Sequence, residues 1–247
     1  MKRHLVLLVL GLFGFLGSLT FASTREDASE RLQNSANVLK EIAAAPDKGI
    51  PEEVLNNAKC IVVVPHLVKA GFIVGAKYGR GVAVCRTGSG ATAGWSAPAF
   101  ISVGGGSWGL QIGAEGVDLV MLVMNDKGLQ HLLSSKFELT GEGSVAAGPV
   151  GRHASAGTDW KLNTEMLTYS RSRGIFAGLT LEGAVVQQDG DATMAIYGNG
   201  TSFRKILHGD VGAPTQAAPF LHAVAEISHQ ARAQEARERT TEDHRTE

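Results

Sequence analysis

The run Cys60-Ile61-Val62-Val63-Val64 begins a region that continues to about residue 125 and alternates short apolar runs with glycines. Runs rich in β-branched residues and bounded by glycine are typical of strands joined by tight turns. Gly79-Arg80 fits a two-residue hairpin turn between two such runs, and consecutive hairpins imply antiparallel pairing. The predicted strands are 60–64, 70–78, 81–86, 93–103, 107–113 and 117–124.

The flanking segments add further strands and a set of helices. Strands are predicted at 165–171 and 175–187, and helices at 25–45, from Pro51 onward, at 126–133, at 190–197 and at 202–208. Glycine supplies 31 of the 247 residues. An open sheet with this many strands would expose long edges. We therefore predict an α+β fold, in which a mainly antiparallel, glycine-rich, closed or nearly closed barrel-like sheet carries N-terminal helices and peripheral and C-terminal helices.

The two ends of the chain differ from the region between them. Residues 1–22 carry Lys2 and Arg3 followed by an uncharged apolar run, which is the pattern of a signal peptide cleaved after Ala22. Alanine, glutamine and alternating charges near the other end predict a helix over 214–238 and then a solvated tail. The predicted divisions are a signal peptide (1–22), one domain (23–209), and a C-terminal helix with a charged tail (210–247). Export predicts a periplasmic or extracellular protein, either free or associated with a membrane.

The overall composition restricts the class of protein. Hydrophobic residues make up 44% of the chain and charged residues 19%, and the formal net charge is −1. This excludes disorder over most of the length, and it excludes a polybasic, nucleic-acid-binding character as a global property.

Two cysteines lie in apolar, strand-like runs. Cys60 begins one run and Cys85 ends another. In an oxidising compartment they form either a cross-strand disulfide or two buried free thiols. Their spacing is not that of a zinc or C-x-x-C redox site.

Motifs for catalysis, nucleotide binding and metal binding are incomplete. Gly104 to Gly109 satisfies G-x-G-x-x-G, but a strand pattern follows it instead of a helix, so we interpret the run as a glycine-rich strand connection. No G-x-S-x-G elbow is present. Asp189-Gly190-Asp191 lacks the rest of a calcium loop and predicts a turn followed by a helix cap. The sequence predicts no catalytic residue, no metal site and no cofactor.

Two groups of side chains remain as candidate sites. Cations in or next to strands are Lys59, Lys69, Lys77, Arg80, Arg86, Arg152, Arg171 and Arg173, and all of them except Lys59 and Arg86 are candidate site residues. Gathered on one rim they would bind phosphates or lipid headgroups, and spread apart they would only solubilise the surface. Arg171 and Arg173 share a strand face, where they either hold a phosphate or pair with acids such as Glu165 or Glu182. The second group is the aromatic residues Trp95, Phe100 and Trp108, which either line an apolar cavity or fill the core.

Six sequence blocks follow one another between about residues 28 and 209. They are Ala58–Pro65, Lys69–Gly75, Gly94–Ala99, Ala146–Arg152, Tyr169–Gly183 and Tyr197-Gly198. Together they resemble the SYLF domain, also called the Ysc84-type actin-binding domain. The resemblance implies binding of phosphoinositides and membranes, or of actin, as in eukaryotic members, and it implies no catalysis. A basic, amphipathic N-terminal helix accompanies membrane binding there, whereas residues 25–43 hold three cations and four acids here.

These observations lead to one expected function and one alternative. We expect a non-enzymatic protein of the bacterial envelope that binds a lipid through its anionic headgroup or associates with the membrane. For an exported protein the ligand would be an envelope phospholipid or lipopolysaccharide. The alternative is a structural or protein-interaction module of the periplasm, in which the barrel has no small ligand and a partner docks on the C-terminal helix.

Overall fold

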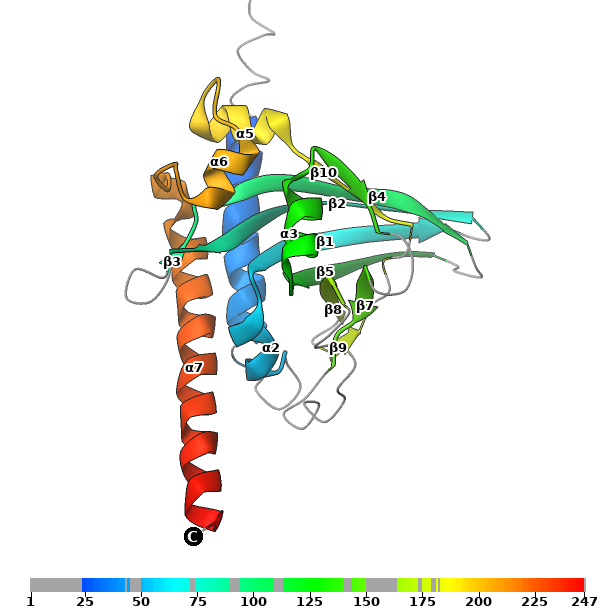
Figure 1. The fold of residues 1–247 in the computed structure, drawn as a ribbon. Helices are drawn as coiled ribbons and strands as arrows, with labels where there is room; N and C mark the ends of the chain where they lie inside the picture. Colours follow the sequence, from blue (N-terminus) through cyan, green and yellow to red (C-terminus); the bar gives the residue numbers. More distant parts are fainter. Residues whose placement is uncertain are drawn as a thin grey trace, which may run out of the picture.

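The computed structural model describes residues 24–42, 44, 50–71, 74–88, 94–108, 113–139, 144–149, 164–172, 175–178, 181 and 183–246. One curled sheet forms the body, and two long helices, one near each end of the chain, pack against it across the direction of its strands (Figure 1). The fold is therefore α+β, as the sequence predicts.

The sheet contains ten strands in the described part of the chain, and neighbours are antiparallel except for β7 beside β8. The strands are β1 (Cys60–Gly71), β2 (Val74–Thr87), β3 (Gly94–Trp95), β4 (Ala99–Trp108), β5 (Gly113–Val123), β6 (Lys136–Glu138), β7 (Val145–Ala147), β8 (Met166–Ser172), β9 (Ile175–Gly178) and β10 (Val185–Gln188). Their order is β6-β10-β4-β2-β1-β5-β8-β7, with β3 beside β2 and β9 beside β8. Because β6 and β7 end this order, the described strands form a curled half-barrel and not a closed barrel.

The helices lie on both sides of this sheet. They are the N-terminal helix (24–42), α2 (Glu52–Asn57), α3 (Asp126–Leu133), α5 (Gly190–Tyr197), α6 (Phe203–His208) and α7 (Ala218–Thr246), with a 3₁₀ turn, η3 (Thr215–Ala217). Within the described helices, none is long and apolar enough to cross a bilayer.

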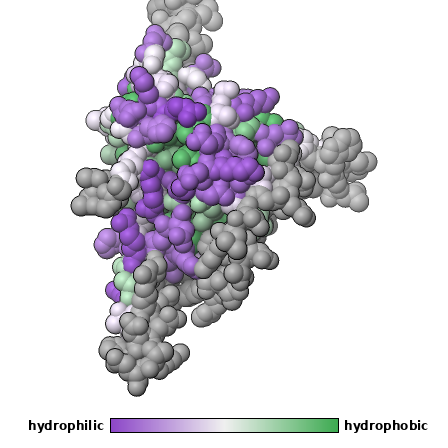
Figure 2. Space-filling model, viewed as in Figure 1, coloured by the Kyte–Doolittle hydropathy of each residue, from purple (hydrophilic) through white to green (hydrophobic). Residues whose placement is uncertain are grey.

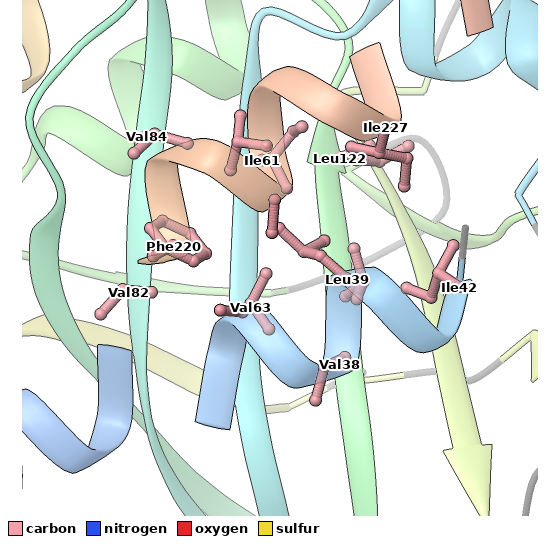
Figure 3. Close-up of a cluster of buried hydrophobic side chains, with 14 of the residues drawn as sticks. Val38, Leu39, Ile42, Ile61, Val63, Val82, Val84, Leu122, Phe220 and Ile227 are labelled. Atoms are coloured by element: carbon pink, nitrogen blue, oxygen red, sulfur yellow. The ribbon is translucent and has the colours of Figure 1, made fainter. Parts of the chain in front are cut away.

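Each face of the sheet carries a buried core, because side chains alternate along each strand. Ile61 and Val63 belong to a core shared with the N-terminal helix and α7 (Figure 3), and we call this side the N-helix face. Cys60 and Val62 belong to a second core shared with α3 and α6, and we call this side the α3 face. A sheet covered on both faces explains why the run from 60 to 64 is apolar throughout.

The predicted hairpin turn at Gly79-Arg80 is wrong. These residues lie inside β2, which runs unbroken from Val74 to Thr87, and β1 ends just before it at Gly71. Gly79 is required there by close packing, because a Cβ atom on it would lie 2.7 Å from Cγ1 of Val64. The glycine therefore marks a close approach between strands, which the local sequence does not distinguish from a turn.

The glycine run at 104–106 is also not a connection between strands. It lies within β4, paired with residues 76–78 of β2. A Cβ atom on Gly105 would lie 2.8 Å from the carbonyl oxygen of Gly183 and 3.4 Å from Cε of Lys77. Glycine therefore makes room for a neighbouring backbone segment and for a lysine side chain.

The C-terminal helix differs from its predicted form in two respects. It continues to Thr246, where a solvated tail was expected beyond 238. Its apolar side is also occupied, because Phe220 and Ile227 (Figure 3), together with Val224, are buried in the core with the N-terminal helix. A partner cannot dock on that side of α7 without displacing the core.

Candidate functional site

The structure does not gather the candidate cations on one rim. Lys69 and Lys77 lie on the α3 face, whereas Arg80 and Arg171 lie on the N-helix face. Of the two alternatives left open by the sequence, a single basic rim does not apply to these four residues. The other two candidates, Arg152 and Arg173, lie outside the described residues.

Arg171 has a structural role in the sheet. Its Nη2 atom donates to Oδ2 of Asp118 on β5 at 2.6 Å, and its Nη1 atom pairs with Glu41 of the N-terminal helix. Burial lowers the pKa of the Arg171 guanidinium. Of the two acids expected as partners, Glu182 lies outside the described residues, and Glu165 contacts other groups: Lys127 Nζ at 2.6 Å and His131 Nδ1 at 2.9 Å.

Lys69 and Lys77 form a row of charge with Glu115. Lys69 is the direct cross-strand partner of Lys77 on one side and of Glu115 on the other. Burial lowers the pKa of both lysines. The negative charge of Glu115 partly raises the pKa of Lys69 again, whereas the positive charge of Lys69 lowers the pKa of Lys77 further. Like charges directly opposite on a sheet are destabilising. The two ammonium groups of this row therefore repel each other where the strands pair.

The N-helix face has a short uncovered strip beside the N-terminal helix. Val68 of β1 and Tyr78 of β2 are cross-strand partners and are 40% and 57% exposed. The next pair on this face, Ala70 and Ala76, is also exposed. We call these four residues the Tyr78 strip. Isolated exposed hydrophobic residues are ordinary, but a contiguous set on a sheet face indicates an interaction surface.

A groove of about 270 Å³ separates the Tyr78 strip from the N-terminal helix. One wall is Asp27, Glu30 and Arg31 of that helix, and the other includes Tyr78 and Arg80. Arg80 lies 3.6 Å from Asp27 across the groove, in an ion pair in which both side chains are 44% exposed. Such a pair stabilises the fold little and leaves its charges open to a partner.

Arg31 is the principal residue that the sequence analysis missed. It is only 6% exposed, its Nη1 donates to Oδ2 of Asp189 at 2.9 Å, and its guanidinium lies 5.4 Å from the ring centre of Phe100. Burial lowers its pKa, and the hydrogen bond to Asp189 opposes that shift. A sequence signal existed, because Arg31 lies three residues after Ala28 and beside Leu32, inside the apolar stripe of its helix.

A backbone irregularity in β1 lies beside the groove. The register of β1 with both neighbouring strands shifts between residues 63 and 68, and His66 has a φ of 57°. Its backbone N–H donates to Oδ1 of Asp118 at 3.0 Å, which satisfies the displaced donor. A bulge of this kind re-aims the side chains that follow it.

The remaining candidate residues have structural positions. The structure joins Cys60 and Cys85, register partners on β1 and β2, by a disulfide. Phe100 is fully buried in the core, and Trp95 packs against that core with the Arg86 guanidinium 4.5 Å from its ring. The side chain of Trp108 lies outside the described residues. The predicted cap before 190–197 is confirmed, because Oδ1 of Asp189 accepts from the Ala192 N–H at 3.0 Å.

The described residues carry surface features that are open to a partner. Within them, no three His, Cys, Asp or Glu side chains are grouped to hold a metal ion. The face seen in Figure 2 is largely hydrophilic where its residues are described. The features open to a partner are the Tyr78 strip with its groove and the lysine row.

Comparisons with known proteins identify the family. Residues 104–227 match the Ysc84 family, described as "Las17-binding protein actin regulator", and the chain belongs to this family. It is 37% identical over 174 residues to an SH3 domain-containing protein of Schizosaccharomyces pombe, covering 69% of this chain and 40% of the relative. It is 33% identical over 191 residues to SH3 domain-containing YSC84-like protein 1 of Homo sapiens, covering 75% and 55%. It is 34% identical over 178 residues to protein YSC84 of Saccharomyces cerevisiae, covering 71% and 37%. The chain thus spans about half the length of these relatives or less.

Proposed function

We propose that this chain is a non-enzymatic module that binds another protein through the Tyr78 strip. The observation that carries the proposal is the exposed Val68–Tyr78 pair on a sheet whose other large apolar residues, among those with described side chains, are covered. The family description, which names an actin regulator that binds a protein, supports this class of function. Apolar side chains on the strip would supply contact area, and the Asp27–Arg80 pair across the groove would supply orientation.

Actin filaments are the first probe, because the family is described as an actin regulator. The purified protein should sediment with filaments, and Tyr78→Ser should weaken this at least about tenfold, since an aromatic residue at the centre of an interface commonly carries much of the affinity. Met194→Ser is the matched control, because Met194 is a similarly exposed apolar residue (37%) on α5. A protein that stays in the supernatant would contradict actin binding, and equal sedimentation of both variants would exclude the strip. For an exported chain, the natural partner would be a protein of the envelope.

Binding of an anionic lipid headgroup is a second candidate, and the lysine row favours it. A phosphate beside Lys69 and Lys77 would offset the repulsion between two ammonium groups that the strand register places side by side. The row lies on the opposite face of the sheet from the Tyr78 strip, so the two functions can be tested separately.

Lys69→Gln should reduce binding to vesicles of phosphatidylglycerol and phosphatidylcholine at least about tenfold, through loss of a charge-assisted contact. Arg80→Gln is the control, because Arg80 is a cation of the same two-stranded segment on the other face.

Vesicle binding should also depend on pH. Because burial lowers the pKa of both lysines, binding should decline at a lower alkaline pH than for freely exposed lysines. Co-sedimentation with vesicles measures both effects. Equal losses in the two variants would indicate a general charge effect and contradict a site at the row.

We also propose that the chain is exported, with residues 1–22 removed. The support is the basic start and uncharged apolar run of this segment. N-terminal sequencing of the protein from the producing cell should begin at Ser23 or within a residue or two of it. A cell-associated product that still begins at Met1 would contradict export by this route.

A further inference from the structure

A cavity of about 420 Å³ lies at the disulfide end of β1 and β2, away from the Tyr78 strip and the lysine row. The end of α2, the end of β2, α3 and α6 each contribute to its lining. All the residues that line it are described, and Cys85 of the disulfide forms part of the wall. The cavity is therefore bounded by secondary structure on several sides and by a covalent cross-link.

The lining is apolar on one side. Leu129 and Leu133 of α3 and Leu207 of α6 provide this side, and the last two are only 4% and 3% exposed. Leucines from two separate helices thus form a wall that an aliphatic chain can contact.

The polar groups of the cavity favour a negative charge. No residue that lines it carries a carboxylate, whereas Lys59 and Arg86 both line it. The ammonium of Lys59 contacts Oδ1 of Asp126 at 2.7 Å, and its side chain remains 41% exposed. A lysine ammonium has three N–H donors, so Lys59 can bind a second anionic group in addition to Asp126.

Arg86 adds a fixed positive charge beside the cavity. Its Nε donates to the carbonyl oxygen of Ala58 at 2.9 Å, and its guanidinium stacks on Trp95. Burial lowers the pKa of Arg86, and the positive charge of Arg232 lowers it further. Its Nη2 also donates to the carbonyl oxygens of Leu55 at 3.2 Å and Asn56 at 3.4 Å, so Arg86 is held at the end of α2 and keeps its positive charge beside the cavity.

The volume limits the size of the ligand. At roughly 30 Å³ for each small group, the cavity holds on the order of a dozen non-hydrogen atoms. We infer that it binds a small amphipathic carboxylate, with the carboxylate at Lys59 and an aliphatic chain of roughly eight carbons against the three leucines. A phospholipid with two acyl chains is too large. This inference does not depend on the protein-binding or vesicle-binding proposals.

Octanoate and 1-octanol are suitable probes, because they share a chain length and differ in charge. Calorimetric titration of the full protein should show octanoate binding at least about tenfold more tightly than 1-octanol, as expected for a charge-assisted contact. Lys59→Gln should remove most of this difference and leave 1-octanol unaffected. Asp126→Asn should strengthen octanoate binding several-fold, because the Asp126 carboxylate no longer competes for the ammonium.

Lys205→Gln is the matched control, because Lys205 is an exposed cation of α6 that does not line the cavity. It should bind octanoate like the unchanged protein. The Lys59 and Asp126 side chains are largely at the surface, so neither substitution should prevent folding. Absence of saturable octanoate binding would overturn the inference. Equal octanoate affinity in Lys59→Gln, Asp126→Asn and the unchanged protein would also overturn it.

Discussion

Replacing Asp189 with alanine should lower the free energy of unfolding by about 3–5 kcal/mol, because it leaves the Arg31 guanidinium charged and unpaired in the core. The side chains of this pair are only 5% and 14% exposed, so water replaces little of the lost interaction. The substitution also removes the cap of α5, whose Ala192 N–H loses its acceptor. Urea unfolding should therefore show a clearly lower midpoint.

Two further variants separate these contributions. Asp191→Asn, which changes an exposed acid in the same helix, should shift stability little. Adding Arg31→Met to Asp189→Ala should recover part of the loss, since an apolar side chain of similar size replaces the unpaired charge. A change below about 1 kcal/mol for Asp189→Ala would show that this ion pair is not buried in solution.

Removing the disulfide should have the second largest effect. Because Cys60 and Cys85 are separated by 25 positions in the sequence, the loop-closure estimate is about 3.5 kcal/mol in the free energy of unfolding. Alanine is the suitable replacement, because both cysteines are buried. A serine at either position would bury a hydroxyl group, which is itself destabilising. Unfolding of Cys60→Ala/Cys85→Ala in urea, compared with the unchanged protein, measures the loss.

A reductant provides the control for the disulfide. It should destabilise the unchanged protein by a similar amount and leave the double variant unaffected. Alkylation in denaturant without reductant, followed by mass spectrometry, distinguishes the bridge from two buried thiols. Modification of both cysteines under those conditions would contradict the bridge.

Local sequence signals predicted most elements of the fold. The apolar stripe of the N-terminal helix, the run from 60 to 64 and the cap at Asp189 each depend on residues close in the chain, where periodicity and capping chemistry act directly. The helices at 190–197 and 203–208 were predicted for the same reason. The sequence blocks also identified the family, because their order along the chain is a property of the sequence.

The mistaken turn at Gly79-Arg80 affects where two of the candidate cations were expected. In an unbroken strand, residues 77 and 80 point to opposite faces, so Lys77 and Arg80 cannot share a rim. Glycine fits both a turn and a close approach between strands, and only the position of β1 beside β2 shows which applies here.

Long-range contacts determined the roles of individual side chains. Arg31 and Asp189 are 158 residues apart in the chain, and Arg171 meets Glu41 only because the N-terminal helix packs across β5 and β8. The sequence therefore contained the charges, the apolar periodicity and the family blocks. Packing in three dimensions decided which charges are paired and which surfaces are exposed, because partners brought together by distant strands and helices leave no local spacing to detect.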